Sequence, residues 1–119
     1  MTFEDFEAFC LSLPAATLAV QWGGTHVYKV GDKVFAMAGT GDDAIDGSYV
    51  FKTSELSFEI LVESGVATRA PYLPRGGWLK LASRAALPDL DLQAYVAQSH
   101  QLVAAGLPKA LRKSLGLPV

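Results

Sequence analysis

The chain has 119 residues, of which 50% are hydrophobic, 10% aromatic and 18% charged. This composition excludes a disordered tail and a coiled coil, and the length predicts a single domain over residues 1–119. The lone Cys10 excludes a disulfide framework and a cysteine-built zinc site. No apolar run approaches the about 18 residues of a membrane span, and the acidic start is unlike a signal peptide, so we expect a soluble cytoplasmic protein without a membrane partner.

The net charge of −2 conceals an uneven distribution along the chain. Residues 1–66 carry ten acidic and three basic residues, a net charge of −7, whereas residues 67–119 carry seven basic and two acidic residues, a net charge of +5. Such asymmetry indicates a charged binding face if the basic residues gather in space, and none if the two halves interleave.

The first elements predicted are a helix and three strands. Thr2 caps the helix and Pro14 ends it, and its apolar face has helical spacing: Phe3, Phe6, Cys10 and Leu13. Three extended segments follow, separated by the turn signals Gly23-Gly24 and Gly31-Asp32: Leu18–Trp22, Thr25–Val30 and Lys33–Ala38. Two-residue turns of this composition favour positive φ, so we expect three consecutive antiparallel strands.

The rest of the chain predicts two more hairpin arms and three more helices. A loop over residues 39–48 leads to a strand at Tyr49–Lys52, and Thr53 or Ser54 caps a helix to about Ser64 with Leu56, Ile60 and Leu61 facing inward. Thr68–Tyr72 and Trp78–Ala82 are expected to form a hairpin. A third helix starts at Asp89 or Asp91 and ends at Gly106, and a short basic helix follows from Lys109 to Leu115. The inward positions of the third helix are Leu92, Tyr95, Val96, Ser99, Leu102 and Val103. The fold class is therefore α+β, an antiparallel sheet of hairpins packed with N-terminal, middle and C-terminal helices.

No motif in the sequence predicts catalysis, a metal or a cofactor. The acidic loop at residues 42–47 lacks a ligand at the third EF-hand position and a Glu at the twelfth, so a solvated turn is favoured over a calcium site. His26 and His100 are the only histidines, and the neighbours Ser99 and His100 point about 100° apart on a helix, which prevents a nucleophile–base contact. An enzyme is the least favoured class, and it requires a histidine near a hydroxyl or carboxylate inside a cleft.

Several segments occur together in an order that resembles the MmcQ/YjbR-like family. They are Cys10–Pro14, Trp22-Gly23, Tyr28–Ala36, Pro71–Leu73, Trp78–Leu81, Ser99, Leu102-Val103 and Leu107–Lys109. The resemblance implies a CyaY-like α+β domain whose hairpins have been likened to a double-wing DNA-binding motif, with no catalytic residues to carry over. This sequence departs from the family at His100, where many members have Tyr, and at Gly76-Gly77, where many have basic residues or histidine.

Two functions remain open on this basis. The first is a DNA-binding module with weak, salt-sensitive affinity for double-stranded DNA, since the chain is acidic as a whole. Its phosphate contacts would come from Arg69, Arg75, Lys80, Arg84, Lys109, Arg112 and Lys113. The alternative is a domain that binds a partner or a small planar ligand, such as a drug or metabolite, in an aromatic groove. The groove residues would be Trp22, Tyr72, Trp78 and His100, although aromatic residues on strands also serve as ordinary core.

Overall fold

The computed structural model describes residues 1–21, 23–39, 48–71, 73 and 76–119. These residues form one six-stranded sheet in the order β1-β2-β3-β4-β6-β5, in which every neighbouring pair is antiparallel. The strands are Ala16–Gln21 (β1), Thr25–Val30 (β2), Lys33–Ala38 (β3), Tyr49–Lys52 (β4), Ala67–Arg69 (β5) and Trp78–Leu81 (β6). The helices are Phe3–Ser12 (α1), Glu55–Glu63 (α2), Asp89–Ala105 (α3) and Lys109–Ser114 (α4). The predicted α+β class is confirmed.

Local chemistry explains where most elements begin and turn. The Thr2 hydroxyl accepts a hydrogen bond from the Asp5 amide at 3.1 Å, and Ser54 caps α2 in the same way through the Ser57 amide. Gly31 and Asp32 have φ values of 56° and 65°, which fit the tight turn predicted between β2 and β3. The predicted pairing of these strands is therefore confirmed.

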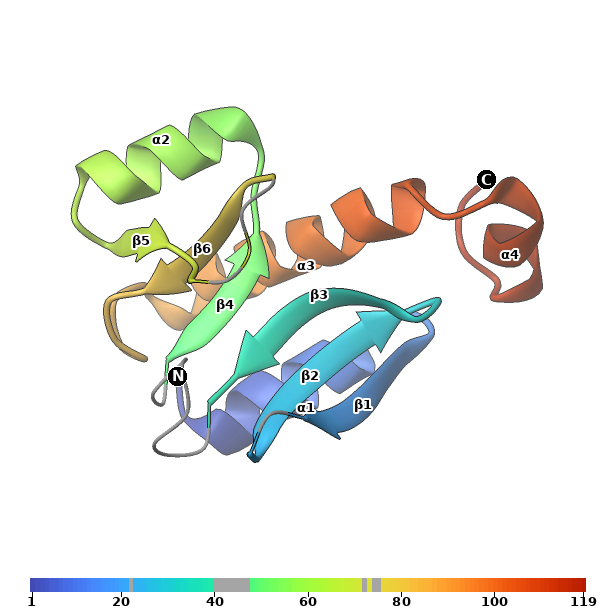
Figure 1. The fold of residues 1–119 in the computed structure, drawn as a ribbon, viewed down its shortest axis with the longest axis horizontal. Helices are drawn as coiled ribbons and strands as arrows, with labels where there is room; N and C mark the ends of the chain where they lie inside the picture. Colours follow the sequence, from blue (N-terminus) through green and yellow to red (C-terminus); the bar gives the residue numbers. More distant parts are fainter. Residues whose placement is uncertain (22, 40–47, 72, 74–75) are drawn as a thin grey trace.

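The helices α1 and α3 lie behind the sheet, while α2 lies beside β5 and α4 lies at the far end of α3 (Figure 1). The main core fills the space between the sheet and these helices, and its largest fully buried side chains are aromatic. Phe6 of α1 stacks on Tyr49 of β4 with ring centroids 3.9 Å apart, and Phe35 of β3 meets His100 of α3 edge to face at 5.1 Å. Aromatic contacts thus join both helices to the same side of the sheet.

One buried hydroxyl joins α3 to two strands. Ser99 Oγ donates a hydrogen bond to the Phe35 carbonyl at 2.6 Å and accepts one from the Lys52 amide at 2.9 Å. These two backbone groups lie just beyond the last paired residues of β3 and β4, Ala36 and Phe51. The hydroxyl therefore takes the place of a direct strand-to-strand hydrogen bond, and it satisfies two backbone groups that would otherwise be buried alone.

The structure also corrects several predictions. Leu56, Ile60 and Leu61 were predicted to face inward from α2, but Leu56 and Ile60 are 68% and 53% exposed, and of the three only Leu61 is buried. Five of the nine residues of α2 are apolar: Leu56, Phe58, Ile60, Leu61 and Val62. Apolar residues thus occur around the helix, so the sequence does not specify which side faces the core. On α3, Leu102 was predicted inward but is 38% exposed, whereas His100 is buried.

Two strand boundaries differ as well. The first strand covers Ala16–Gln21 instead of starting at Leu18, and the arm predicted at Thr68–Tyr72 is the three-residue strand Ala67–Arg69. Ala15 has a φ of 59°, which turns the chain into β1 earlier than the glycine pattern suggested. The acidic loop at residues 40–47 lies outside the described residues.

Candidate functional site

The sheet has a second face that no described helix covers. Cross-strand partners point to the same side of an antiparallel sheet, so the register assigns residues to each face. Val27 pairs with Met37, Met37 with Val50, and Val50 with Lys80. These side chains point away from α1 and α3, whose contacts are with the alternate residues such as Tyr28 and Phe51. We call this side the open face.

Three strand lysines lie on the open face. Lys29 follows Val27 by two positions in β2, Lys52 follows Val50 by two positions in β4, and Lys80 pairs directly with Val50 from β6. Each is partly buried, which is consistent with a hydrocarbon stem lying along the sheet and an ammonium group at the surface. Three separate strands thus present positive charge on one surface.

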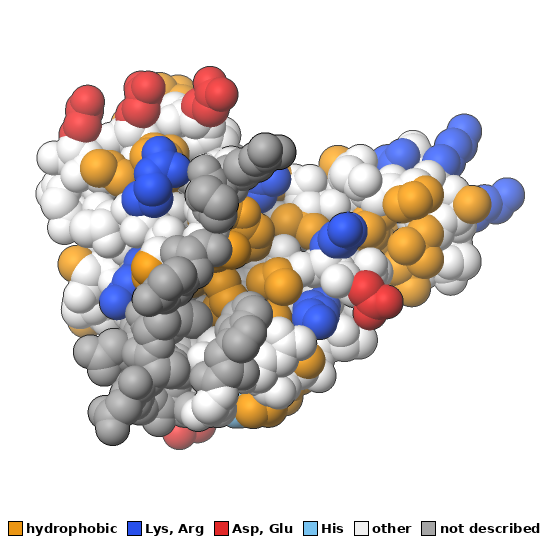
Figure 2. Space-filling view, in the orientation of Figure 1, with side chains coloured by type: hydrophobic (Ala, Val, Ile, Leu, Met, Phe, Trp, Pro, Cys, Tyr) orange, Lys and Arg blue, Asp and Glu red, His pale blue; other side chains and the backbone are white. Residues whose placement is uncertain are grey.

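A small apolar cluster lies between these lysines. Its buried members are Val27, Met37, Val50 and Ala70, and its partly buried members are Val34, Leu73 and Trp78. Figure 2 views this side of the molecule, where hydrophobic side chains gather along the middle and Lys and Arg side chains lie around them. Trp78 pairs with Lys52 across β6 and β4, so the indole lies beside an ammonium group at this surface.

Acidic side chains are absent from the open-face strand positions that the structure describes. Glu55, Glu59 and Glu63 are exposed on α2, where Figure 2 shows three acidic groups in a row along one end of the molecule. Asp32 is exposed in the turn between β2 and β3. Among the described residues, the open face therefore carries lysines around an apolar middle and has acidic groups only at its borders.

Gly77 fixes the chain close to β4 at the border of the open face. Its carbonyl accepts hydrogen bonds from the Thr53 amide at 2.7 Å and from the Thr53 hydroxyl at 3.1 Å. A Cβ atom at this position would lie in steric overlap with the Thr53 carbonyl oxygen. Glycine is therefore required where related sequences were expected to carry basic residues or histidine, and β6 can approach β4 closely.

The basic residues predicted to bind phosphate are dispersed over the structure. Lys80 is on the open face, whereas the Arg69 guanidinium lies 4.9 Å from the ring centre of Phe58 near α2. Arg84 donates a hydrogen bond to the Gly39 carbonyl at 2.9 Å and lies over the Phe3 and Tyr49 rings. Lys109, Arg112 and Lys113 belong to α4 at the far end of the molecule, and Arg75 lies outside the described residues. Only Lys80 of this described set lies on the open face.

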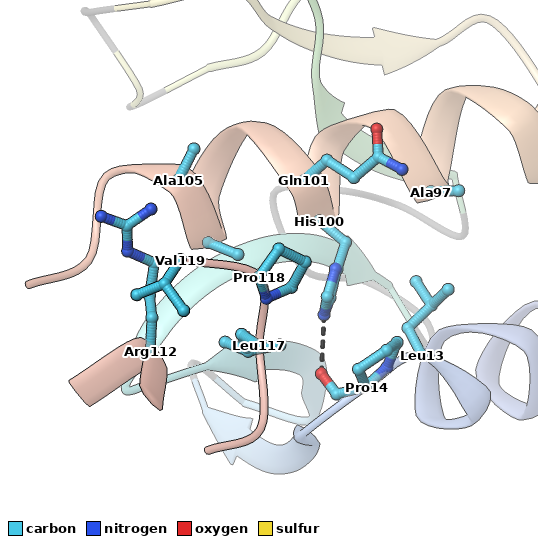
Figure 3. Close-up of a pocket in the computed structure, with 11 residues that line it drawn as sticks. Leu13, Pro14, Ala97, His100, Gln101, Ala105, Arg112, Leu117, Pro118 and Val119 are labelled. Atoms are coloured by element: carbon cyan, nitrogen blue, oxygen red, sulfur yellow. Dashed lines mark hydrogen bonds between the residues drawn. The ribbon is translucent and has the colours of Figure 1, made fainter. Parts of the chain in front are cut away.

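The residues predicted for an aromatic groove are also separated. Trp78 lies on the open face, whereas His100 lies on α3 at the opposite side of the sheet, in ring contact with Phe35. Trp22 and Tyr72 lie outside the described residues. His100 instead lines a pocket of about 470 Å³ between α3, α4 and the segment after α1 (Figure 3).

His26 has a carboxylate partner, which is part of what an enzyme would require. Its Nδ1 lies 2.5 Å from Glu7 Oε1, and the Tyr28 hydroxyl donates to the same oxygen at 3.2 Å. Burial raises the pKa of Tyr28 and of the neighbouring Cys10 thiol above their usual values, and the Glu7 carboxylate raises both further. The His26–Glu7 pair joins β2 to α1. The Tyr28 hydroxyl and the Cys10 thiol stay protonated and act as core groups.

Sequence reasoning missed Lys29 and Lys52 as site residues because they belong to the acidic half of the chain. A signal for them was present in the strand pattern. Lys29 stands in a strand between apolar neighbours, as Lys80 does, and Lys52 follows Phe51 at the end of its strand. Alternation along a strand gives every second residue to one face. The pairing of β4 with β6 then brings the lysines of both halves together.

Two features are absent from the described part of the chain. None of its helices is long and apolar enough to cross a membrane. It also holds no group of three or more His, Cys, Asp or Glu side chains placed to bind a metal ion.

Comparisons with known proteins identify a family and a solved structure of similar fold. A family model described as YjbR matches residues 11–102. The fold is similar to the crystal structure of Deinococcus radiodurans protein DR2400, which has the family-model domain DUF419, with a TM-score of 0.81 and 25% identity. The alignment covers 98% of this chain and 89% of that chain. No curated protein matches the sequence.

Proposed function

This chain belongs to the YjbR family, and we propose that it is a cytoplasmic nucleic-acid-binding module that holds double-stranded DNA against the open face. The observation that carries the proposal is the placement of Lys29, Lys52 and Lys80 on three strands of one surface that no described helix covers. At the usual strand spacing, β2 and β6 are about 14 Å apart, so these charges spread across a width suited to a duplex backbone. Phosphate contacts of this kind position a protein on DNA without reading its sequence.

The sheet face supports the proposal better than the hairpin tips do. The turn between β2 and β3 is packed against the segment that carries α4, since a Cβ atom on Gly31 would lie 2.7 Å from Leu107 Cδ1 and 3.3 Å from Leu111 Cδ2. The Gly31 side of this turn is therefore covered, and the exposed Asp32 gives its other side a negative charge. We therefore assign the phosphate contacts to the strand lysines, with Trp78 as an adjacent apolar contact.

The surrounding charges predict weak binding. Three phosphate contacts give a salt slope of about −2.7, so the affinity should fall about 40-fold between 50 and 200 mM salt. The exposed Glu55, Glu59 and Glu63 on α2 repel phosphate, which disfavours the approach of a duplex across that border. The net charge of −2 adds to this repulsion.

The test is a fluorescence anisotropy titration of a labelled duplex at both salt concentrations, with a labelled single strand of the same sequence alongside. We expect Lys52→Glu and Lys80→Glu each to weaken duplex binding about tenfold or more, because each reverses a charge at the proposed contact. Lys113→Glu is the matched control, since it makes the same charge change on exposed α4.

Two results would refute this assignment. Equal weakening by Lys80→Glu and Lys113→Glu would show that only net charge matters and that the open face is not the site. Duplex binding that is absent at 50 mM salt in the unmodified protein would remove DNA as the ligand. If the protein bound the single strand more tightly than the duplex, the proposed phosphate contacts to a duplex would give way to a model in which bases stack on Trp78.

A further inference from the structure

The pocket beside α3 lies on the side of the sheet opposite the open face, and its lining comes from three separate segments. Leu13 and Pro14 follow α1, His100 and Ala104 belong to α3, and Leu117 belongs to the segment after α4. Its volume of about 470 Å³ is within the range of small-molecule sites. Nothing in the proposed DNA contact uses these residues.

Most of the pocket wall is hydrocarbon. Leu13, Ala97, Ala104, Leu117 and Pro118 contribute apolar side chains. His100 is 4% exposed, and its Nε2 is hydrogen bonded to the Pro14 carbonyl at 2.7 Å, as Figure 3 shows. This contact closes one end of the pocket by holding α3 to the segment after α1. An apolar ligand body would therefore meet a largely preformed hydrocarbon wall.

One charged side chain of the lining has a buried donor without a partner among the described residues. Arg112 comes from α4, and its side chain makes no hydrogen bond or ion pair with the described residues, although its Nε atom is buried. Its backbone is held in place, because the Leu117 amide donates to the Arg112 carbonyl at 2.9 Å. A buried donor on a charged group without an acceptor is costly in a folded protein. The Nε–H of Arg112 is thus an unsatisfied donor beside an apolar cavity, on a helix whose end is held in place.

The ligand that satisfies both features carries one anionic group and an apolar body. A carboxylate matches the planar guanidinium through two parallel hydrogen bonds. A phosphate monoester can form the same pair, but it carries a second negative charge, and the lining has no second cation to neutralise that charge. The hydrocarbon wall excludes a strongly polar body, since its polar groups would lose water without gaining partners. A small monocarboxylic acid with an aliphatic or aromatic body fits these constraints.

We propose that this pocket binds a small apolar monocarboxylate, with Arg112 pairing with the carboxylate and the walls from α3 and residues 117–118 enclosing the body. The proposal is independent of DNA binding, because the pocket and the open face share no residue. It assigns to Arg112 a role in ligand binding in place of the phosphate contact that the sequence suggested.

The experiment is a titration of the ¹⁵N-labelled protein with sodium octanoate, followed by amide chemical shifts, with 1-octanol as the uncharged probe. We expect saturable shifts at Ala97, Ala104 and Leu117 with a Kd of about millimolar, which is usual for a ligand of this size. Octanol should bind about tenfold more weakly, because it cannot form the charged pair with Arg112.

Two variants make the assignment specific. Arg112→Gln should weaken octanoate about tenfold and leave octanol unchanged, whereas Lys113→Gln, which removes a charge from the same helix on its exposed side, should change neither. Ala97→Phe should block both probes by filling the cavity, and it keeps the test valid if Arg112→Gln loosens α4. Octanoate shifts outside the pocket, equal affinities for octanoate and octanol, or full binding by Ala97→Phe would each overturn the proposal. Duplex binding that survives in Ala97→Phe separates this site from the open face.

Discussion

The two faces of the sheet differ in what covers them and in what they carry. The covered face holds Phe6, Tyr28, Phe35, Tyr49 and Phe51 in a core with α1 and α3. The open face carries a much smaller apolar cluster surrounded by Lys29, Lys52, Lys80 and Trp78. Adjacent residues of the same strand, such as Phe51 and Lys52, therefore belong to different physical environments.

This difference indicates that the covered face mainly stabilises the fold, whereas the open face carries the residues of the proposed binding site. Burial of apolar area on the covered face supplies most of the free energy of folding, because that is where the large side chains lose contact with water. The open face contributes little to that total and can carry unpaired positive charge at small cost. Because no described helix packs on this face, its lysines and Trp78 are the groups that the proposed ligand would contact.

The largest effect should come from deleting a ring on the covered face. Phe51→Ala is expected to lower the free energy of unfolding by about 3–5 kcal/mol, because Phe51 is fully buried and its removal leaves a cavity. Urea denaturation followed by circular dichroism measures the change. Phe58→Ala is the control, since Phe58 is only partly buried on α2 and should cost less. Equal losses for the two variants would break the distinction between the core and its border.

A smaller loss is expected where α3 is bonded to the strands. Ser99→Ala should lower the free energy of unfolding by about 2–3 kcal/mol, because it leaves the Phe35 carbonyl and the Lys52 amide without their partner. Ser114→Ala removes an exposed hydroxyl bonded to the Leu111 carbonyl at 2.9 Å, and it should cost no more than about 0.5 kcal/mol. Urea midpoints for both variants test this, and a loss for Ser99→Ala as small as the control's would mean that water replaces the hydroxyl.

The sequence predicted the parts of the fold that depend on local chemistry. The glycine turns predicted β2 and β3 with their observed boundaries, and Thr2 and Ser54 predicted helix starts. It did not predict which side of α2 faces the core, because apolar residues occur around that helix and only packing selects Leu61 over Leu56. Local signals are strong at turns and caps and weak on a short, evenly apolar helix.

The candidate sites depended on contacts that are distant in the sequence. Lys80 was predicted, but Lys29 and Lys52 join it only because β6 pairs with β4 and lies between β4 and β5. That strand order is not determined by spacing along the chain. The pocket at Arg112 likewise requires α3, α4 and the segment after α1 to meet. The sequence of α4 taken alone predicts only an exposed basic helix.

The covered face also predicts how stability depends on alkaline pH. Burial raises the pKa of the Cys10 thiol and of the Tyr28 hydroxyl above their ordinary values of 9.0 and 10.0, with Glu7 adding to both shifts. A group with a raised pKa in the folded state stabilises fully below its unfolded pKa, and that stability is lost as the pH rises above it. Urea midpoints should therefore be level near neutral pH and fall above about pH 9.

The variant Tyr28→Phe sharpens this prediction. It should reduce the fall between pH 9 and pH 11, since one of the groups that ionises on unfolding is gone, and it should cost about 1 kcal/mol at pH 7 because the hydrogen bond to Glu7 is lost. Tyr95→Phe is the control, because Tyr95 is only partly buried on α3. An unchanged alkaline slope in Tyr28→Phe would mean that this hydroxyl does not contribute to the pH dependence.

The smallest effects on stability are expected on the open face. Lys29→Ala and Lys80→Ala should each change the free energy of unfolding by no more than about 0.5 kcal/mol, because an ammonium group at the surface contributes little to folding. The same variants should lower the salt slope of duplex binding by about one each, since each removes one phosphate contact. Urea denaturation and anisotropy on the same samples measure both quantities. A large loss of stability without a change in salt slope would contradict the distinction between the two faces. The lysines would then contribute to folding, and the open face would have no role in binding.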